Sequence, residues 1–409
     1  MARETIAFSS GLMKALYPEL CEDILSAGYF SGEEKGWDAA PIESLPEEPS
    51  SLEEKIRGMA SLPMRTIAPR SDKPVVVILA GGKGSRMGEG IQQKVLSPIG
   101  GHPALRLAME TYRSFGLKDF ILIVGVGYKD VLRCIGAEDG VTYLYQDAPL
   151  GTGHACRLAS RYLKFMDYEG DVVVTMGDKY VTAHGLQRLL ENHQARRPDL
   201  TLTTASKSAW PDSGRVALGE SGGVCAIVEK PDIVLKRLIY DFVHWPSDPV
   251  PAKAFWERAL SYWPRPQKLR KILGAFGDVL ETEEWISKEK GRRLLRDCDP
   301  YFSISETMKL LGSEIEERCE EVNLSLYIFQ SRALYESTEK LEPNNAQGEL
   351  YLTDAAHYLV SQNHDSGYRV VTSRMPDDYD VMGFNTVEEL ARIEGRARRD
   401  STASQAENE

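Results

Sequence analysis

The sequence predicts an α/β protein built on a mostly parallel, mixed sheet that is flanked by helices. Three observations support this class. A continuous apolar run at residues 75–80 is typical of a strand buried on both faces of a parallel sheet. The run ends at Gly81, Gly82 and Gly84, where backbone N–H groups can approach an anion closely. Strand-like and helix-like segments alternate after it, which indicates βαβ units.

Residues 1–70 form a helical N-terminal extension in this prediction. Short amphipathic segments at 11–27 and 52–59 are separated by an acidic, proline-containing segment at 41–51. No pattern in this region suggests chemistry. We expect an extension that packs on the main domain, and a docking arm or oligomerisation element is the alternative.

Residues 71–230 carry the alternating pattern of a Rossmann-like nucleotide-binding part. Ligands of such sheets bind in the crevice at the carboxyl ends of the strands. The predicted strands are 75–80, 120–126, 141–146, 171–177 and 200–206, followed by a hairpin at 216–230 that turns at 221–223. The predicted helices are 103–115, 129–135, 153–165 and 185–196.

The pattern changes over residues 231–321, which we interpret as a helical insertion. This stretch holds four of the six tryptophans and shows helical periodicity, for example at 252–262 and 267–276. Its aromatic side chains are expected to form a core. Strand signals return at 321–329 and 368–372, within a remainder that covers 322–398. A helix from residue 386 is expected to fade into a disordered tail at 399–409.

Composition excludes several classes of function. The formal net charge of −12 argues against a nucleic-acid-binding surface. The six cysteines are scattered without a C-x-x-C pair, which argues against a zinc site or a disulfide framework. The apolar runs are too short to cross a membrane, and residues 1–10 lack the order of a signal peptide. A cytoplasmic protein without a membrane or nucleic-acid partner is expected.

The glycine loop after residue 80 predicts a polyanionic ligand. Lys83, Arg86 and Lys94 place three cations close to the glycines. The loop does not match the dinucleotide fingerprint, because Met87 stands at the third glycine position, and no P-loop string occurs. Taken alone, the loop would also fit a tight turn with solvated cations.

Two further strand ends should meet this loop. Residues 146–155 read Q-D-A-P-L-G-T-G-H-A, a strand end followed by a helix start whose free N–H groups can hold a ligand. His154 in this string is interpreted as a helix-start or packing residue rather than a catalyst. Asp178 follows the apolar residues 172–174 and is suited to hold a divalent cation against phosphate oxygens. Taken alone, Asp178 could equally cap a helix or turn.

Three strings together resemble the sugar-1-phosphate nucleotidyltransferase family. They are L-A-G-G-K-G-S-R-M at 79–87 with K-V-L at 94–96, then L-G-T-G-H-A at 150–155 preceded by Gln146, then N-N-A-Q-G-E-L-Y-L-T-D at 344–354. The resemblance is greatest to the N-acetylglucosamine-1-phosphate uridyltransferase (pyrophosphorylase) domain of a bacterial bifunctional enzyme. It implies a fold of the nucleotide-diphospho-sugar transferase type.

The resemblance also implies a role for each matching residue. The residues expected to contact the nucleoside are Leu79, Ala80, Gly81 and Gly82 through their backbone, and Gln146, Gly151 and Thr152 at the base edge. Arg86 is expected to face the triphosphate, and Lys94 to neutralise phosphate charge. Asp178 and Asn385 are the expected Mg²⁺ ligands. Gly214, Glu229 and Asn323 match the positions that hold the hydroxyls and the N-acetyl group of the sugar.

The implied reaction transfers a nucleotidyl group to a sugar 1-phosphate. A phosphate oxygen of the sugar substrate attacks the α-phosphorus in line, and pyrophosphate leaves. This nucleophile is already ionised near neutral pH, so the chemistry needs positioning and charge neutralisation rather than a strong base. The resemblance implies UTP and N-acetylglucosamine 1-phosphate as substrates and Mg²⁺ as cofactor.

Three departures from the family pattern affect this expectation. The long separation of Glu229 from Asn323 leaves the insertion free to cover the sugar site, alter sugar choice or bind a partner. Only 24 residues follow Asn385, so no acetyltransferase domain and no acetyl transfer are expected. Lys179 beside Asp178 could weaken metal binding or contact phosphate.

Several alternatives remain open at this stage. The nucleotide could carry another base, the sugar phosphate could be a different one, or the chain could be a catalytically weak regulatory protein that binds a nucleotide-sugar. A homo-oligomer or a protein partner bound through residues 1–70 or 231–321 is also compatible with the sequence.

Overall fold

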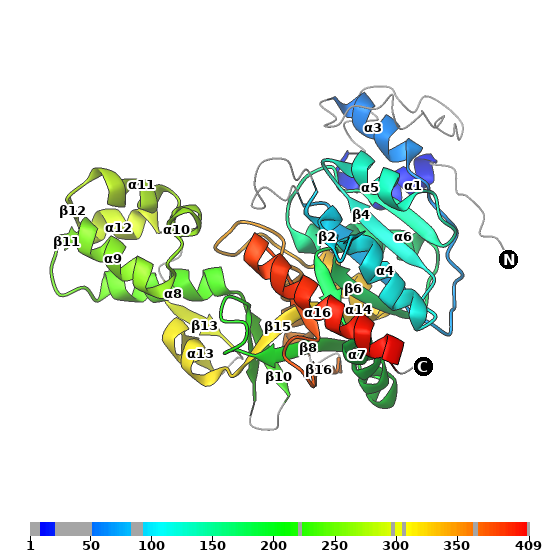
Figure 1. Ribbon diagram of the computed structural model, residues 1–409. Helices are drawn as coiled ribbons and strands as arrows, with labels where there is room; N and C mark the ends of the chain where they lie inside the picture. Colours follow the sequence, from blue (N-terminus) through cyan, green and yellow to red (C-terminus); the bar gives the residue numbers. More distant parts are fainter. Residues whose placement is uncertain are drawn as a thin grey trace.

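The computed structural model describes residues 9–20, 51–82, 93–219, 223–295, 299–304, 308–362 and 367–406. Within these residues the chain forms a body around one large sheet, and an arm projects from one side of it (Figure 1). Arg86 and Lys83 of the glycine loop, most of the acidic 41–51 segment and the tip of the hairpin at 221–222 lie outside the described residues.

One half of the sheet is parallel, as the apolar runs predict. Its strands follow the order β5 (Val141–Tyr145), β4 (Phe120–Val124), β1 (Val75–Ala80) and β6 (Asp171–Met176). Val76 pairs with Phe120 on one side of β1 and with Val173 on the other. Every residue of β1, β4 and β5 is buried, because helices cover parallel strands on both faces.

The other half is largely antiparallel and makes the sheet mixed. Strand β15 (Glu321–Gln330) runs antiparallel to β6, β8 and β9, and β16 runs parallel to β8. The remaining bounds are β8 (Leu200–Ser206), β9 (Arg215–Leu218), β10 (Val224–Val228) and β16 (Val370–Arg374). The predicted α/β class with a mixed sheet flanked by helices is confirmed.

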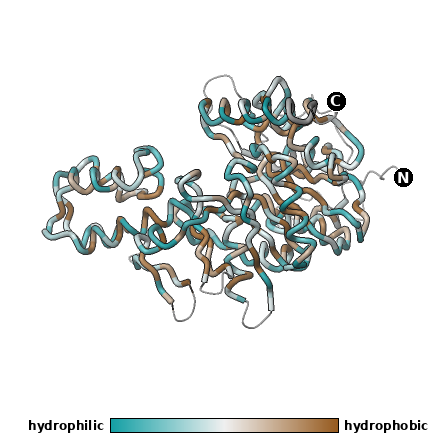
Figure 2. Tube along the Cα trace, turned by 60° about the horizontal axis from the view of Figure 1, so that its bottom comes forward, coloured by the Kyte–Doolittle hydropathy of each residue, from teal (hydrophilic) through white to brown (hydrophobic). Residues whose placement is uncertain are grey.

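Helices of the body pack into one continuous core with the sheet. They are α4 (Ala104–Ser114), α5 (Tyr128–Ile135), α6 (Thr152–Phe165), α7 (Ala183–Arg196), α14 (Ser331–Glu339) and α15 (Leu352–Ser361). Helix α6 contacts β1 and β4 and is itself covered by α14 and α15. In Figure 2 the chain segments inside the body are mostly brown, which places the hydrophobic residues there.

Short elements organise the loops at the edge of the sheet. They are η2 (Lys94–Leu96), β2 (Pro98–Ile99), β3 (His102–Pro103), β7 (Lys179–Val181) and β17 (Val381–Gly383). Strand β7 pairs with β17, so that Lys179 lies opposite Gly383. No local sequence pattern predicts this pairing, which brings the segments after residues 177 and 383 together.

The N-terminal extension packs on the body. Helix α1 (Ser10–Leu16) contacts α6, and α3 (Leu52–Ser61) contacts β5. The hydroxyl of Tyr17 donates a hydrogen bond of 2.7 Å to the Tyr145 carbonyl at the end of β5. The packing interpretation of this extension therefore agrees with the described residues.

The insertion begins with α8 (Lys230–Val243) and is mostly helical. Its other elements are β11 (Val250–Pro251), α9 (Ala252–Tyr262), α10 (Pro266–Leu273), α11 (Ala275–Thr282), β12 (Trp285–Ile286), α12 (Lys288–Leu294), β13 (Tyr301–Ser303), β14 (Lys309–Leu311) and α13 (Gly312–Arg318). We call residues 250–295 the arm. The expected single helix at 267–276 is wrong, since Gly274 with φ of 51° separates α10 from α11.

The arm and helix α8 share an aromatic core that is separate from the core of the body. Phe242, Phe255 and Phe276 pack edge to face with ring centroids 5.0–5.8 Å apart, and Trp263 is buried beside them. Trp285 departs from the expectation that these aromatics are core, because it is 56% exposed.

The tail prediction is wrong for most of its length. Helix α16 (Val387–Ala406) continues through residues 399–406, which were expected to be disordered. Two contacts on Asp400 explain the continuation: the Tyr180 hydroxyl donates to it at 2.8 Å, and Arg396 pairs with it one helical turn away. No helix among the described residues has both the length and the apolar character needed to span a membrane.

Candidate active site

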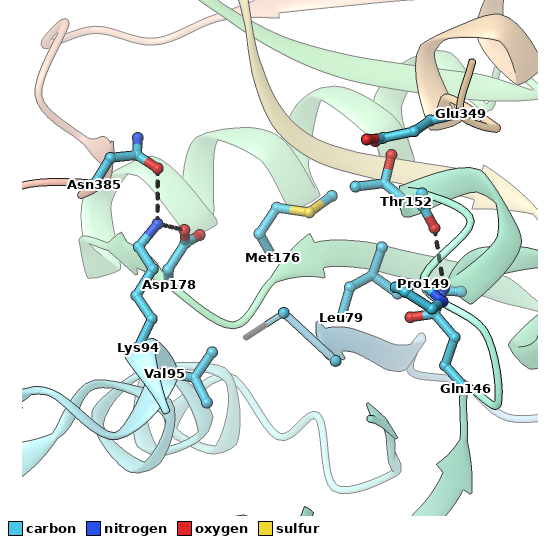
Figure 3. Close-up of a pocket in the computed structure, with 14 residues that line it drawn as sticks. Leu79, Lys94, Val95, Gln146, Pro149, Thr152, Met176, Asp178, Glu349 and Asn385 are labelled. Carbon is cyan, nitrogen blue, oxygen red and sulfur yellow. Dashed lines mark hydrogen bonds and ion pairs between the residues drawn. The ribbon is translucent and has the colours of Figure 1, made fainter. Parts of the chain in front are cut away.

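A cavity of about 370 Å³ opens at the carboxyl ends of β1 and β6. This is the edge of the sheet where the sequence predicts ligand binding. The residues that line it are Leu79, Gly81, Gly82, Lys94, Val95, Gln146, Pro149, Gly151, Thr152, Ala155, Met176, Asp178, Glu349 and Asn385. The two ends of the cavity differ in chemistry, and Leu79 and Met176 lie between them (Figure 3).

One end carries a cation between two oxygen ligands. Lys94 Nζ contacts the Asp178 carboxylate and lies 3.1 Å from Asn385 Oδ1 (Figure 3). Asp178 is held in the turn between β6 and β7, and Asn385 follows β17, so the β7–β17 pairing sets their separation. The ammonium also lies 5.2 Å from the ring centre of Phe384, which is fully buried.

The same pair of oxygens fits a hard divalent cation. A carboxylate and an amide oxygen are ligands that Mg²⁺ accepts, and Mg²⁺ commonly takes only one or two protein ligands beside substrate phosphates. The position of the Lys94 ammonium between these oxygens shows that they attract positive charge there. The donor set therefore fits the metal that the resemblance implies.

The other end is built around the uncharged amide of Gln146, and the carboxylate of Glu349 lies beside Thr152 at the same end (Figure 3). Gln146 Nε2 donates to the Gly151 carbonyl at 3.2 Å and lies 3.2 Å from His154 Nδ1. A Cβ atom at Gly81 would lie 2.8 Å from Gln146 Oε1, so a larger residue there would displace this amide from its present position. His154 Nδ1 also lies 3.1 Å from the Ala148 carbonyl, which fits its interpretation as a packing residue. Burial lowers the pKa of His154.

Two further contacts fix the start of α6. Gly151 has φ of 110°, in the left-handed region that favours glycine, and a Cβ there would lie 2.6 Å from the Leu350 carbonyl. Gly153 N donates to that carbonyl at 2.7 Å, and Leu350 N donates to the Leu150 carbonyl at 2.7 Å. The loop at 344–351 is therefore attached to the loop at 150–153.

The expected sugar residues form a second group outside this cavity. A Cβ at Gly214 would lie 3.2 Å from the Glu229 carboxylate, and Asn323 N donates to the Gly214 carbonyl at 2.9 Å. Asn323 Nδ2 donates to the Tyr327 hydroxyl at 2.6 Å. The structure thus brings these three residues together.

Glu229 of the second group and two neighbouring carboxylates, Asp232 and Asp354, are poorly hydrated. Desolvation, with the charge of Asp232 as the next cause, raises the pKa of Glu229 to about 7. The same two causes raise the pKa of Asp354 to about 7, and burial raises that of Asp232 to about 6. We call Glu229, Asp232 and Asp354 the carboxylate cluster.

Lys179 interacts with charged residues of both the nucleotide cavity and the second group. A Cβ at Gly383 would lie 3.0 Å from its Nζ. Desolvation lowers the pKa of Lys179, and the charges of Asp178 and of Glu229 oppose that shift. Lys179, which departs from the family pattern, therefore interacts electrostatically both with Asp178 in the cavity and with Glu229 in the carboxylate cluster.

Some lining residues were not among the sequence candidates. Glu349, Val95, Pro149, Ala155 and Met176 line the cavity. Glu349 lies inside the 344–354 string, so its position in a diagnostic motif was the signal that could have found it. Conversely, the predicted contact residue Ala80 is buried in β1 and does not line the cavity.

Comparisons with known proteins agree with this geometry. Residues 76–295, more than half of the chain, match the MobA-like NTP transferase domain. The bifunctional protein GlmU of Staphylococcus haemolyticus is 24% identical over 311 residues, which cover 76% of this chain and 49% of that protein. GlmU of Exiguobacterium sibiricum is 35% identical over 164 residues, covering 40% of this chain and 35% of that protein.

A solved structure shares the fold. A Bacillus anthracis protein assigned as a glucose-1-phosphate thymidylyltransferase aligns with a TM-score of 0.50 at 17% identity, covering 80% of this chain and 96% of that one. The chain spans about half the length of several curated relatives it matches. These matches confirm the resemblance to sugar-1-phosphate nucleotidyltransferases. The domain match covers more than half of the chain, and the cavity lies at the strand ends where such a sheet binds its ligand. This chain therefore belongs to the family of MobA-like NTP transferase domains.

Proposed function

We propose that this chain catalyses the Mg²⁺-dependent transfer of a uridylyl group from UTP to N-acetylglucosamine 1-phosphate. The observation that carries the proposal is a single cavity with a neutral amide at one end and a cation between two oxygen ligands at the other. A nucleoside triphosphate has the same polarity, with a neutral base at one end and phosphates at the other.

The orientation of Gln146 favours a base with a ring N–H, such as uracil, over cytosine. Its Nε2 is used by the Gly151 carbonyl, which leaves Oε1 as an acceptor beside Gly81. Uracil presents an N–H donor on its pairing edge, whereas the corresponding ring nitrogen of cytosine is an acceptor. A site built around a hydrogen bond rejects an analogue that lacks the partner group.

Lys94, Asp178 and Asn385 are proposed to serve the phosphates. Asp178 and Asn385 would hold Mg²⁺, which would offset phosphate charge as it develops in the transition state. Lys94 would exchange its present oxygen partners for phosphate oxygens of the nucleotide. Arg86 is proposed to contact the triphosphate as well.

The second group is proposed to hold the acceptor sugar. Gly214 offers its backbone, and Glu229 and Asn323 offer a carboxyl and an amide to the hydroxyls and the N-acetyl group. A phosphate oxygen of the sugar phosphate then forms a bond to the α-phosphorus, and the bond from that phosphorus to the bridging oxygen of pyrophosphate breaks. The attacking phosphate oxygen is already ionised, so no proton needs to be removed, and each residue serves binding or orientation.

Pyrophosphate release tests the proposal directly. The purified chain is assayed with Mg²⁺ and each of UTP, dTTP, CTP and GTP against N-acetylglucosamine 1-phosphate and glucose 1-phosphate. We expect release with UTP and N-acetylglucosamine 1-phosphate, and little with CTP. Release with a different pair would replace the assigned base or sugar, and binding of a nucleotide-sugar without any release would favour a regulatory protein.

A further inference from the structure

Helix α10 of the arm contacts two loops of the body at the same time. Arg265, at its start, forms an ion pair with Asp212, and Lys271, in its last turn, lies 2.8 Å from Glu349. Lys271 Nζ also lies 3.5 Å from Gln347 Oε1. In Figure 1, α10 lies on the side of the arm that faces the body, next to the orange loop that carries Glu349.

The two loops belong to different groups of the site. Glu349 lines the nucleotide cavity, and its loop is hydrogen-bonded to the loop at 150–153 through Leu350. Asp212 lies two residues before Gly214, whose carbonyl accepts from Asn323 in the second group. One helix thus connects the rim of the nucleotide cavity to the loop of the second group.

The sequence of α10 explains why it can bridge these loops. Leu269, Ile272 and Leu273 are buried and pack into the arm core, so that face is fixed. The charged groups of Arg265 and Lys271 remain free to contact the body. A second connection supports the same loop, because Asp232 of α8 accepts from Ala346 N at 2.6 Å, and Ala346 packs on the arm core.

We propose that α10 is a clasp that holds these two loops in register for substrate binding, with Arg265 and Lys271 as positioning residues. Both ion pairs are partly exposed, with side chains 33–54% accessible, and exposed ion pairs contribute little to stability. The clasp can therefore open and close at low cost as substrates enter and products leave. The expected change in KM rests on the proposed function, whereas the contact of α10 with both loops rests on geometry alone.

The test compares a double variant, Arg265→Ala with Lys271→Ala, with the wild-type chain. Hydrogen exchange without substrates should become roughly three- to tenfold faster in residues 209–214 and 344–351. The KM for the sugar phosphate should rise by a similar factor, while kcat stays within about twofold. A matched control, Arg270→Ala, removes a similar ion pair on the same helix that reaches Glu281 inside the arm. The control should leave both loops and the KM unchanged.

A charge exchange sharpens the test. In a chain that keeps Lys271, Asp212→Arg combined with Arg265→Asp restores an ion pair of opposite direction, so residues 209–214 should keep most of the protection that the alanine variant loses. Neither residue lines the cavity, so the exchanged charges do not contact the nucleotide site directly. Unchanged exchange in both loops would overturn the clasp, as would faster exchange with an unchanged KM. If the wild-type chain releases no pyrophosphate with any substrate pair, the proposed function fails, and the exchange result still decides the clasp.

Discussion

The proposed metal end of the cavity, with Asp178 and Lys94, and the carboxylate cluster place acidic groups in opposite electrostatic settings. Asp178 has the ammonium of Lys94 against it. Among the described residues, Glu229, Asp232 and Asp354 form no ion pair with a cation, and burial raises the pKa of each. The first setting suits a charged substrate and a metal, because charge there stays compensated. The second suits neutral hydroxyl and amide groups of a sugar.

Removal of the metal-end carboxylate should have the largest effect. Asp178→Asn removes the charged member of the proposed Mg²⁺ pair, so kcat should fall by about a thousandfold or more. Circular dichroism should show an unchanged fold, since the side chain is not part of the core. A rate within tenfold of the wild type would place the metal elsewhere and end the contrast between the two settings.

Loss of the cation should have the next largest effect. Lys94→Ala leaves the Asp178 charge without its partner and removes a proposed phosphate contact, so kcat should fall by roughly a hundredfold. The thermal midpoint should change much less. Arg133→Ala, which removes an ion pair to Asp130 on α5, is the control. Similar losses of activity in both variants would show that Lys94 acts only through stability.

The carboxylate cluster predicts a pH dependence of stability. The pKa of Glu229 is raised to about 7 in the folded chain, so its contribution is fully present below its unfolded pKa and is lost as pH rises through 7. Glu229→Gln removes this loss, and the variant should gain stability relative to the wild type between pH 5 and pH 8, by at most about 3 kcal/mol.

Urea unfolding at both pH values measures this gain. Glu257→Gln changes an exposed carboxylate on α9 and serves as the control. A stability difference between variant and wild type that stays constant with pH, or that grows equally in the control, would contradict the prediction. Either result would show that desolvation does not raise the pKa of Glu229 in the folded chain.

Loss of the Gln146 amide should give the smallest effect. Gln146→Ala removes an uncharged acceptor, so the preference for UTP over CTP should fall by about tenfold while Mg²⁺ dependence is kept. The ratio of kcat/KM for the two nucleotides measures this. An unchanged ratio would mean that base choice lies in backbone groups such as those of Gly81 and Gly82.

Much of the fold was predictable because its signals are local. The strand bounds of β1 and β8 match the predicted 75–80 and 200–206, since long apolar or β-branched runs bounded by polar turns specify strands. The helices at 103–115 and 153–165 were found within two residues for the same reason. Two predicted helix boundaries were wrong, and in each case a single residue sets the observed boundary. Gly274 divides a predicted helix, and contacts to Asp400 extend α16.

The sequence by itself determined the class of the sheet, the three family strings and the residue types of the site. Only the tertiary structure decided how those residues group. The β7–β17 pairing places Asn385 beside Asp178, and the arm ties Lys271 to Glu349. Neither contact leaves a local pattern, because each joins segments far apart in the chain through strand pairing or a surface ion pair. The pKa shifts of Glu229 and Asp354 were likewise invisible, since desolvation depends on what packs around a side chain and not on its neighbours in sequence.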